Sequence, residues 1–303
     1  MAKKKPISNI WHPFYWPTWL GVGLLRLISL LPYDWQLKIG SGIGLLAYYL
    51  ASDRVHITRT NIDLCFPERS VEERQQLVKQ VLINSGIGII ETGYAWTSSV
   101  TKLIPRFAFK GLSNLERAVA EQQPVLLLGM HFSTLDLCGA VLAKKVPFRV
   151  MYRKNKNFVL EKVMSEGRQS NFPDAIERSN VRGVIKALKN KQVVWYGADQ
   201  DYGLKQSVFA SFFGVPAASI TATARIAKMT GATVIPFYHH RDQNNLYTIT
   251  LGEPLKDYPT GDDVEDATRV NNLVEQAILE APDQYWWVHR RFKTRPPGLQ
   301  RPY

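Results

Sequence analysis

Apolar residues recur along this 303-residue chain in two patterns, one typical of buried strands and one typical of helices. The run over residues 125–130 is continuous and ends at His131, as expected for a strand buried in a parallel sheet. Further strands are expected at residues 148–152, 192–197, 233–238 and 247–251, and helices at 135–145, 158–169, 181–188, 220–229 and 264–279. This alternation predicts a single α/β domain with a mostly parallel sheet flanked by helices.

Upstream of residue 125 the pattern is mainly helical. The motif Ser70-x-x-Glu73 is a capping box, and it opens a segment whose helical periodicity predicts a long helix to about residue 96. Glycines at positions 86, 88 and 93 indicate close packing of this helix against a neighbour. They do not suit a nucleotide-binding loop, because their spacing differs and no strand precedes them.

The first 50 residues predict attachment to a membrane. Lysines at positions 3–5 precede a cluster of aromatic residues between Trp11 and Trp19, which is typical of the membrane–water interface. The apolar stretch 17–31 is shorter than the roughly 20 residues that span a bilayer, although extension back to Trp11 would reach that length. We favour a helix lying in the cytoplasmic leaflet, because a single span would export the Lys- and Arg-rich remainder. The alternatives are a single span and a buried core helix. We thus expect a membrane-associated helical segment over residues 1–50 and an α/β domain over residues 51–303.

The composition narrows the possible partners. The chain has 38 Lys and Arg against 26 Asp and Glu, which gives a net charge of +12. This charge favours binding to nucleic acid, to an anionic membrane or to an acidic protein or substrate. Nucleic acid is disfavoured because no helix-turn-helix, zinc or ribonucleoprotein motif is present. The two cysteines, Cys65 and Cys138, are too few for a disulfide framework or a zinc site, which indicates a reducing environment.

His131 and Asp136 form the first candidate site, at the point where the first strong strand gives way to a helix. Ligands of α/β sheets bind at the carboxyl ends of strands. If the helix turns Asp136 back toward the imidazole, the carboxylate would fix the tautomer of His131 and make its other nitrogen a general base. The alternative is a capping Asp beside a strand-end His that has no role in chemistry.

Polar residues at two further strand ends strengthen the catalytic interpretation. Arg153 follows the strand at 148–152, and Asp199, Gln200 and Asp201 follow the strand at 192–197. The two aspartates could form a carboxylate pair for glycoside chemistry, but a loop that shapes the site is the better interpretation.

Other candidate chemistries have weaker support. No G-x-S-x-G elbow is present, which disfavours a serine lipase. His239 and His240 are expected to be a surface pair and not metal ligands, since no carboxylate or cysteine stands at ligand spacing. His289, in a run of basic residues, indicates either a tail that faces phosphate or a carrier, or a solvated charged segment.

Several blocks together resemble the late acyltransferases of lipid A biosynthesis, the lauroyl/myristoyl transferase group of the lysophospholipid acyltransferase superfamily. The matching blocks are the H-x4-D motif at residues 131–136, Met-Tyr-Arg at 151–153, Arg178, and the segments 194–203, 207–216 and 285–295. The resemblance covers nearly the whole chain. Within this group the acidic residue of the first block is often Glu, so Asp136 departs toward the wider superfamily pattern.

The resemblance implies transfer of an acyl chain from an acyl carrier protein thioester to a hydroxyl of a lipid A precursor of the Kdo2-lipid IVA type. It places the protein at the cytoplasmic face of the inner membrane, with no cofactor and no metal. His131 and Asp136 would be catalytic, and the substrate-binding residues would be Arg153, Arg178, Asp199, Gln200 and Asp201. An acyltransferase of the same superfamily with a lysophospholipid or glycolipid acceptor is the alternative, and a membrane-peripheral nucleic-acid-binding protein is a more distant one.

Overall fold

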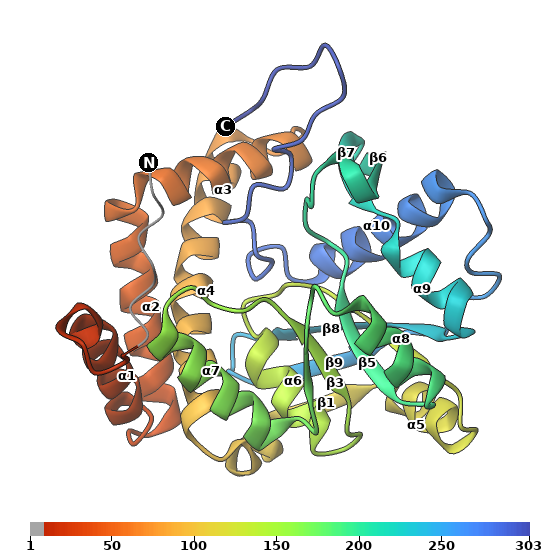
Figure 1. The fold of residues 1–303 in the computed structure, drawn as a ribbon. Coiled ribbons are helices and arrows are strands. Elements are labelled where there is room, and N and C mark those ends of the chain that lie inside the picture. The colour runs from red at the N-terminus through yellow and green to blue at the C-terminus, as the bar shows by residue number, and fades with distance from the viewer. Residues whose placement is uncertain (1–8) are drawn as a thin grey trace.

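The core of the protein is a seven-stranded sheet, seen in a computed structural model that describes residues 9–303 (Figure 1). The strands follow the order β1-β9-β8-β2-β5-β3-β4. They are β1 (Phe107–Lys110), β2 (Val125–Gly129), β3 (Arg149–Tyr152), β4 (Ala175–Glu177), β5 (Val193–Gly197), β8 (Thr233–Arg241) and β9 (Tyr247–Leu251). Neighbouring strands are parallel except for the antiparallel pair β8 and β9. The predicted mostly parallel sheet is therefore confirmed.

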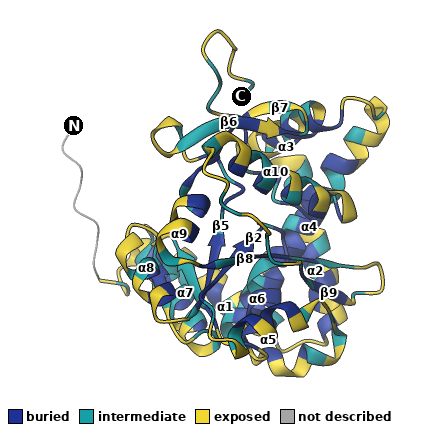
Figure 2. Cartoon of the chain, turned by 90° about the vertical axis from the view of Figure 1, so that its right-hand side faces the viewer, coloured by how far each residue is buried: buried dark blue, intermediate teal, exposed yellow. Residues whose placement is uncertain are grey.

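Helices cover both faces of this sheet. They are α5 (Leu112–Ala120), α6 (Leu135–Ala143), α7 (Phe158–Asn171), α8 (Val181–Lys189), α9 (Ala222–Thr230) and α10 (Asp263–Glu280). Successive residues of β2 serve opposite faces, so Leu127 joins the apolar cluster that includes α6, and Leu126 joins the cluster that includes α8 and α9. Figure 2 shows β2, β5 and β8 in the buried centre and exposed positions on the outer helix faces.

A hairpin over β6 (Ser207–Phe212) and β7 (Val215–Ile220) was not expected from the sequence, and neither were β1 and β4. The two hairpin strands are joined by Phe213 and Gly214, which both have positive φ, of 50° and 72°. Such a turn normally shows itself by an Asn-Gly or Asp-Gly pair. Phe213 gives no such signal, which explains why the hairpin was missed.

The N-terminal third forms a group of helices on one side of the sheet (Figure 1). These are the short 3-10 helix Pro13–Tyr15, α1 (Trp16–Ile28), α2 (Tyr33–Leu50), α3 (Ser52–Cys65) and α4 (Val71–Thr97). The predicted capping box of α4 is present, because Ser70 and Glu73 bond each other's backbone N–H groups. The predicted boundary at residue 50 between a membrane-associated segment and the α/β domain stays a prediction. Helix α2, before this boundary, packs directly against α4, after it.

Glycines allow α4 to approach its neighbours closely, as predicted. A Cβ on Gly86 would lie 2.3 Å from the backbone nitrogen of Gly44 in α2. A Cβ on Gly88 would lie 2.6 Å from the carbonyl oxygen of Ser133, in the loop that follows His131. The helical group is therefore packed directly against the loop of the candidate site.

Helix α1 leaves most of its surface uncovered and buries only Val22. Its exposed face carries Trp16, Leu20, Leu24 and Leu27, which are between 51% and 66% exposed. The alternative of a buried core helix is therefore wrong. Within residues 9–303, no helix has the length and apolar content needed to cross a membrane. Lysines 3–5 lie outside the described residues.

Candidate active site

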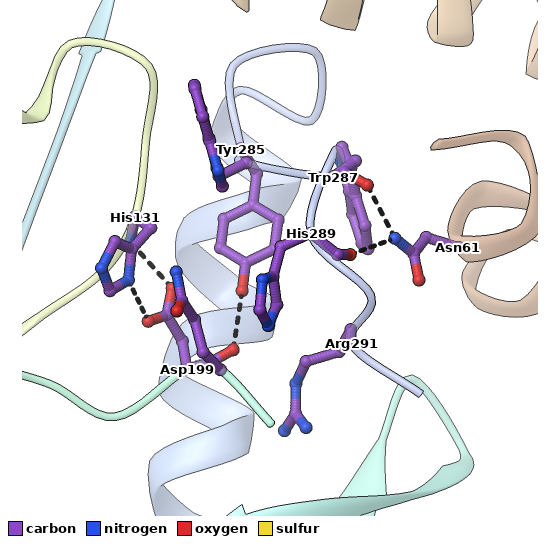
Figure 3. Close-up of a pocket in the computed structure, with 9 residues that line it drawn as sticks. Asn61, His131, Asp199, Tyr285, Trp287, His289 and Arg291 are labelled. Atoms are coloured by element: carbon purple, nitrogen blue, oxygen red, sulfur yellow. Dashed lines mark hydrogen bonds and ion pairs between the residues drawn. The ribbon is translucent and has the colours of Figure 1, made fainter. Parts of the chain in front are cut away.

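His131 lies just beyond the carboxyl end of β2, and its imidazole is held by Asp199 (Figure 3). Strand β5 pairs with β2 in register, Gly129 opposite Gly197, so the loops that follow the two strands meet. The Nδ1 atom of His131 lies 2.5 Å from Asp199 Oδ1, and the backbone N–H of His131 donates to Asp199 Oδ2 at 2.8 Å. A Cβ on Gly197 would lie 2.6 Å from His131 Cε1, so glycine there makes room for the ring.

The charges of this pair reinforce each other. Burial would lower the pKa of His131, but the charge and hydrogen bond of Asp199, with a smaller contribution from Asp136, raise it above the usual value. Burial would raise the pKa of Asp199, but the positive charge of His131 and its hydrogen bonds lower it. Asp199 is therefore the anion that favours an imidazolium, and the Nε2 atom of His131 remains to act as a base.

Asp136 does not make the expected contact with His131. Helix α6 begins at Leu135, so Asp136 stands in its first turn, and its carboxylate faces α4. There it accepts hydrogen bonds of 3.3 Å from Thr92 Oγ1 and Trp96 Nε1. The prediction that Asp136 orients the imidazole is thus corrected, because the carboxylate that does so comes from the neighbouring strand. Asp136 stays close enough to contribute to the raised pKa of His131.

Two cavities meet at His131. The first, called here the apolar cavity, has a volume of about 290 Å³ and lies between α6, β3 and α7. Its lining is mostly apolar and includes Leu135, Gly139, Phe148, Val150, Met164 and Phe172. The second has a volume of about 630 Å³ and is called here the cationic cavity because Arg153, Arg178, Lys205 and Arg225 line it, although much of its wall is apolar and includes Val181, Ile220 and Ile226. His131, Tyr152, Arg153 and Trp195 line both, so the imidazole stands where two unlike cavities join.

The other residues predicted to bind substrate separate into two groups. Arg153 and Arg178 are exposed and line the cationic cavity, as does Gln200. Asp199 is engaged by His131, and the buried Asp201 accepts hydrogen bonds from the backbone N–H and the hydroxyl of Thr294. Substrate contact by Arg153, Arg178 and Gln200 stays a prediction, whereas both aspartates are occupied by bonds within the protein.

The C-terminal segment completes the frame of the site through contacts that no local sequence pattern predicts. The backbone N–H of Trp286 donates to His131 O at 2.9 Å, and Ser133 N donates to Gln284 O at 2.8 Å. The Tyr285 hydroxyl donates to the carbonyl oxygen of Asp199 at 3.2 Å. The sequence signals for this segment are the family resemblance of residues 285–295 and the density of aromatic residues at 285–287.

Three further histidines were considered in the sequence. His289 is partly buried and its Nε2 atom is shielded from solvent, which disfavours the solvated charged segment, whereas a tail that faces phosphate or a carrier stays a prediction. Burial, with a smaller effect of Lys293, lowers the pKa of His289 to about 4. His239 is fully buried and hydrogen-bonded to Thr134 at 2.6 Å, so the expected surface pair with the half-buried His240 is wrong. In the described part of the chain, no three His, Cys, Asp or Glu residues are grouped as metal ligands would be.

Comparison with known proteins points to one family. The family described as "Bacterial lipid A biosynthesis acyltransferase" matches residues 3–294. The lipid A biosynthesis lauroyltransferase of Escherichia coli (strain K12) is 37% identical over 294 residues, covering 96% of both chains. The palmitoleoyltransferase of the same organism is 37% identical over 289 residues, covering 95% of this chain and 94% of that protein. Its myristoyltransferase is 28% identical over 296 residues, covering 96% and 91%.

Proposed function

This chain belongs to the bacterial lipid A biosynthesis acyltransferases, and from that premise we propose that it moves a fatty acyl chain from an acyl carrier protein thioester to a hydroxyl of a lipid A precursor. The acceptor is of the Kdo2-lipid IVA type. The observation that carries the proposal is the position of His131, oriented by Asp199 at the junction of an apolar and a cationic cavity. Such a junction suits a reaction that joins a hydrocarbon chain to an anionic glycolipid.

The chemistry requires a base and a good leaving group. His131 Nε2 takes the proton of the acceptor hydroxyl as its oxygen attacks the thioester carbonyl carbon. A new C–O bond forms, the C–S bond breaks, and the thiolate leaves with the proton that the imidazolium returns. Asp199 stabilises the positive charge on the ring during the transfer, and Asp136 adds to that effect from the side of α4. The step consumes no cofactor and no metal.

The two cavities give each substrate a place. The apolar cavity excludes water from an acyl chain that enters beside His131, because its walls are mainly Leu, Val, Met and aromatic side chains. The cationic cavity presents Arg153 and Arg178 to acceptor phosphate, since guanidinium groups form paired hydrogen bonds with phosphate oxygens. Gln200 lines the same cavity and can hydrogen-bond the sugar hydroxyls.

The N-terminal helices supply the membrane contact. The apolar face of α1 that begins at Trp16 is exposed, and α2 exposes Trp35, Leu46 and Leu50. A helix that lies in the headgroup region, with its apolar face toward the acyl chains, removes these side chains from water without crossing the bilayer. This arrangement, with a net charge of +12, favours the anionic cytoplasmic face of the inner membrane.

The decisive experiment incubates the purified protein with acyl carrier proteins loaded with chains of 10 to 16 carbons and a tetra-acylated lipid A precursor, with and without Kdo. Mass spectrometry should show a product heavier by one acyl chain and no product with His131→Ala. Product from a lysophospholipid or another glycolipid, and none from the lipid A precursor, would favour the alternative acceptor class. Turnover of acyl-CoA only would contradict the proposed donor.

A further inference from the structure

A third and much smaller cavity is lined by Asp199 and by residues of the C-terminal segment (Figure 3). Its volume is about 10 Å³, close to the smallest space that holds one water molecule. Its lining is almost entirely polar or aromatic: Asn61, His131, Asp199, Gln200, Tyr285, Trp286, Trp287, His289 and Arg291. A polar cavity of this size is the kind that buried water occupies, whereas dry cavities are apolar.

Three groups of this lining can each form a further hydrogen bond. The Nε2 atom of His289 and the Nε atom of Arg291 are buried and have no hydrogen-bond partner. Arg291 is only 2% exposed, and its two terminal nitrogens already donate to Ala218 O and Ser219 Oγ. Each carboxylate oxygen of Asp199 accepts one hydrogen bond from His131 and can accept another.

We propose that one water molecule occupies this cavity and links His289 to Asp199, which makes His289 a positioning residue for the His131–Asp199 pair. The water accepts from the Nε–H of Arg291 and donates to His289 Nε2 and to the Asp199 carboxylate. These three bonds equal the number that a buried water typically makes. They also satisfy two polar atoms whose burial without partners would destabilise the fold.

The protonation state of His289 supports this arrangement. Burial and the charge of Lys293 lower the pKa of His289 to about 4, so the ring is neutral near pH 7 and its Nε2 can accept a hydrogen bond. The charges of Lys293, Asp199, His131 and Asp201 act on His289, and the guanidinium of Arg291 lines the same cavity. Because the ring is neutral, it acts on Asp199 through the hydrogen bond of the water and not through charge.

The water should affect the reaction because it and His131 both donate hydrogen bonds to the Asp199 carboxylate. This step rests on the proposed role of His131 as the base. A water that donates to Asp199 withdraws part of the negative charge that the carboxylate offers to the imidazole. Loss of the water should therefore raise the pKa of His131 further and leave the carboxylate less firmly placed. We expect His289→Leu to lower kcat about tenfold, the effect of one hydrogen bond to a charged group, with KM for both substrates unchanged.

A crystal structure of the full chain that resolves ordered water tests the site without reference to activity. We expect one water within hydrogen-bond distance of His289 Nε2, Arg291 Nε and the Asp199 carboxylate. An empty cavity, or a direct bond between His289 and Asp199, would overturn the proposal even if the enzyme is an active acyltransferase. This measurement uses the unaltered protein, so it remains decisive if a variant fails to fold.

The pH dependence of kcat/KM tests the positioning role. In His289→Leu the acidic limb should move to higher pH, and His289→Gln, whose amide oxygen can still accept from the water, should restore the position of the limb. His56→Leu, at an exposed histidine of α3, is the matched control and should change neither quantity. A folded His289→Leu enzyme with an unchanged pH profile would refute the inference. Full activity of His131→Ala would instead refute the proposed function and leave the water site standing.

Discussion

His131 has a raised pKa because one buried carboxylate bonds its Nδ1 atom and a second lies farther away. The acidic limb of kcat/KM reports the base of the free enzyme, so activity should fall as the pH drops through this raised value. Asp199→Asn removes the carboxylate that raises the pKa of His131 more, so the acidic limb should move to lower pH while kcat falls. Asp136→Asn should move it in the same direction by less. An equal or larger shift in Asp136→Asn, measured over the same pH series, would contradict the ranking.

The size of the catalytic loss tests whether His131 and Asp199 act together. Removal of a positioned general base costs about 10²–10⁴ in rate, and His131→Ala should lie near the upper end of that range. The double variant of His131→Ala with Asp199→Asn should be little slower than His131→Ala alone, since residues that act as a unit give non-additive losses. The measurement is kcat/KM for all three proteins, with circular dichroism to confirm folding. Losses that multiply would mean that the two residues act independently.

At this scale the sequence predicted where His131 lies but not the carboxylate that bonds it, and its role as the base stays a prediction. The position of His131 was predicted because a continuous apolar strand ends just before it. Asp136 was assigned to it because the two are close in sequence, whereas Asp199 is 68 residues away. That contact depends on β5 lying beside β2, and strand order in a parallel sheet cannot be derived from local pattern. The roles of Tyr285 and His289 depend in the same way on where the C-terminal segment crosses the site.

Strands and helices with strong periodicity were predicted well, and those defined by tertiary contacts were not. The capping box and glycines of α4 have local signatures, and β2 is apolar at every position. Strands β1 and β4 have only four and three residues, too few to show a period, and they form because they pair with β9 and β3.

Helix α6 forms one wall of the apolar cavity, and its glycine sets the space available there. Leu135 and Gly139 line the cavity one turn apart, so Gly139 lies about 6 Å deeper along the helix axis. Phe148 and Arg153, which flank β3 on either side, also line the cavity. The cavity therefore runs along the whole length of this strand, away from His131. A Cβ at Gly139 would lie 3.6 Å from Phe172 Cζ, an ordinary contact that fills space without a clash.

Substitution of Gly139 should therefore shift the preferred acyl chain toward shorter lengths. A side chain at this depth occupies the space of the chain end, and one methylene too many in an apolar pocket changes kcat/KM by about 10–200-fold. Competition among carriers loaded with 10 to 16 carbons should show a graded shift for Gly139→Ala and Gly139→Leu. Gly42→Leu, in α2 with open space around it, is the matched control. An unchanged chain preference in both folded Gly139 variants would exclude the apolar cavity as the acyl site.

The whole molecule presents its apolar and its basic features in different places. Exposed Leu and Trp side chains gather on α1 and α2, whereas the arginines of the cationic cavity lie at the carboxyl edge of the sheet. The predicted helix at the N-terminus formed, but the sequence alone did not show which of its faces is covered. The structure answers this, because Val22 and Leu25 face the protein and the opposite stripe is left open.

This open stripe predicts how the enzyme is held at the membrane. Leu20, Leu24 and Leu27 follow one face at spacings of four and three residues, and each is at least half exposed, so Gln at these positions should not disturb the core. Burial of one Leu side chain contributes about 1.5–3 kcal/mol, so the double change Leu24→Gln with Leu27→Gln should weaken binding to anionic vesicles by about 100-fold or more. Leu279→Gln is the matched control, because this side chain is 58% exposed on α10, away from the stripe. Sedimentation with vesicles gives the partition, and the acceptor KM should rise with the loss of binding while turnover of an acceptor dispersed in detergent stays the same. Equal vesicle binding by the double variant and the control would show that α1 does not anchor the protein.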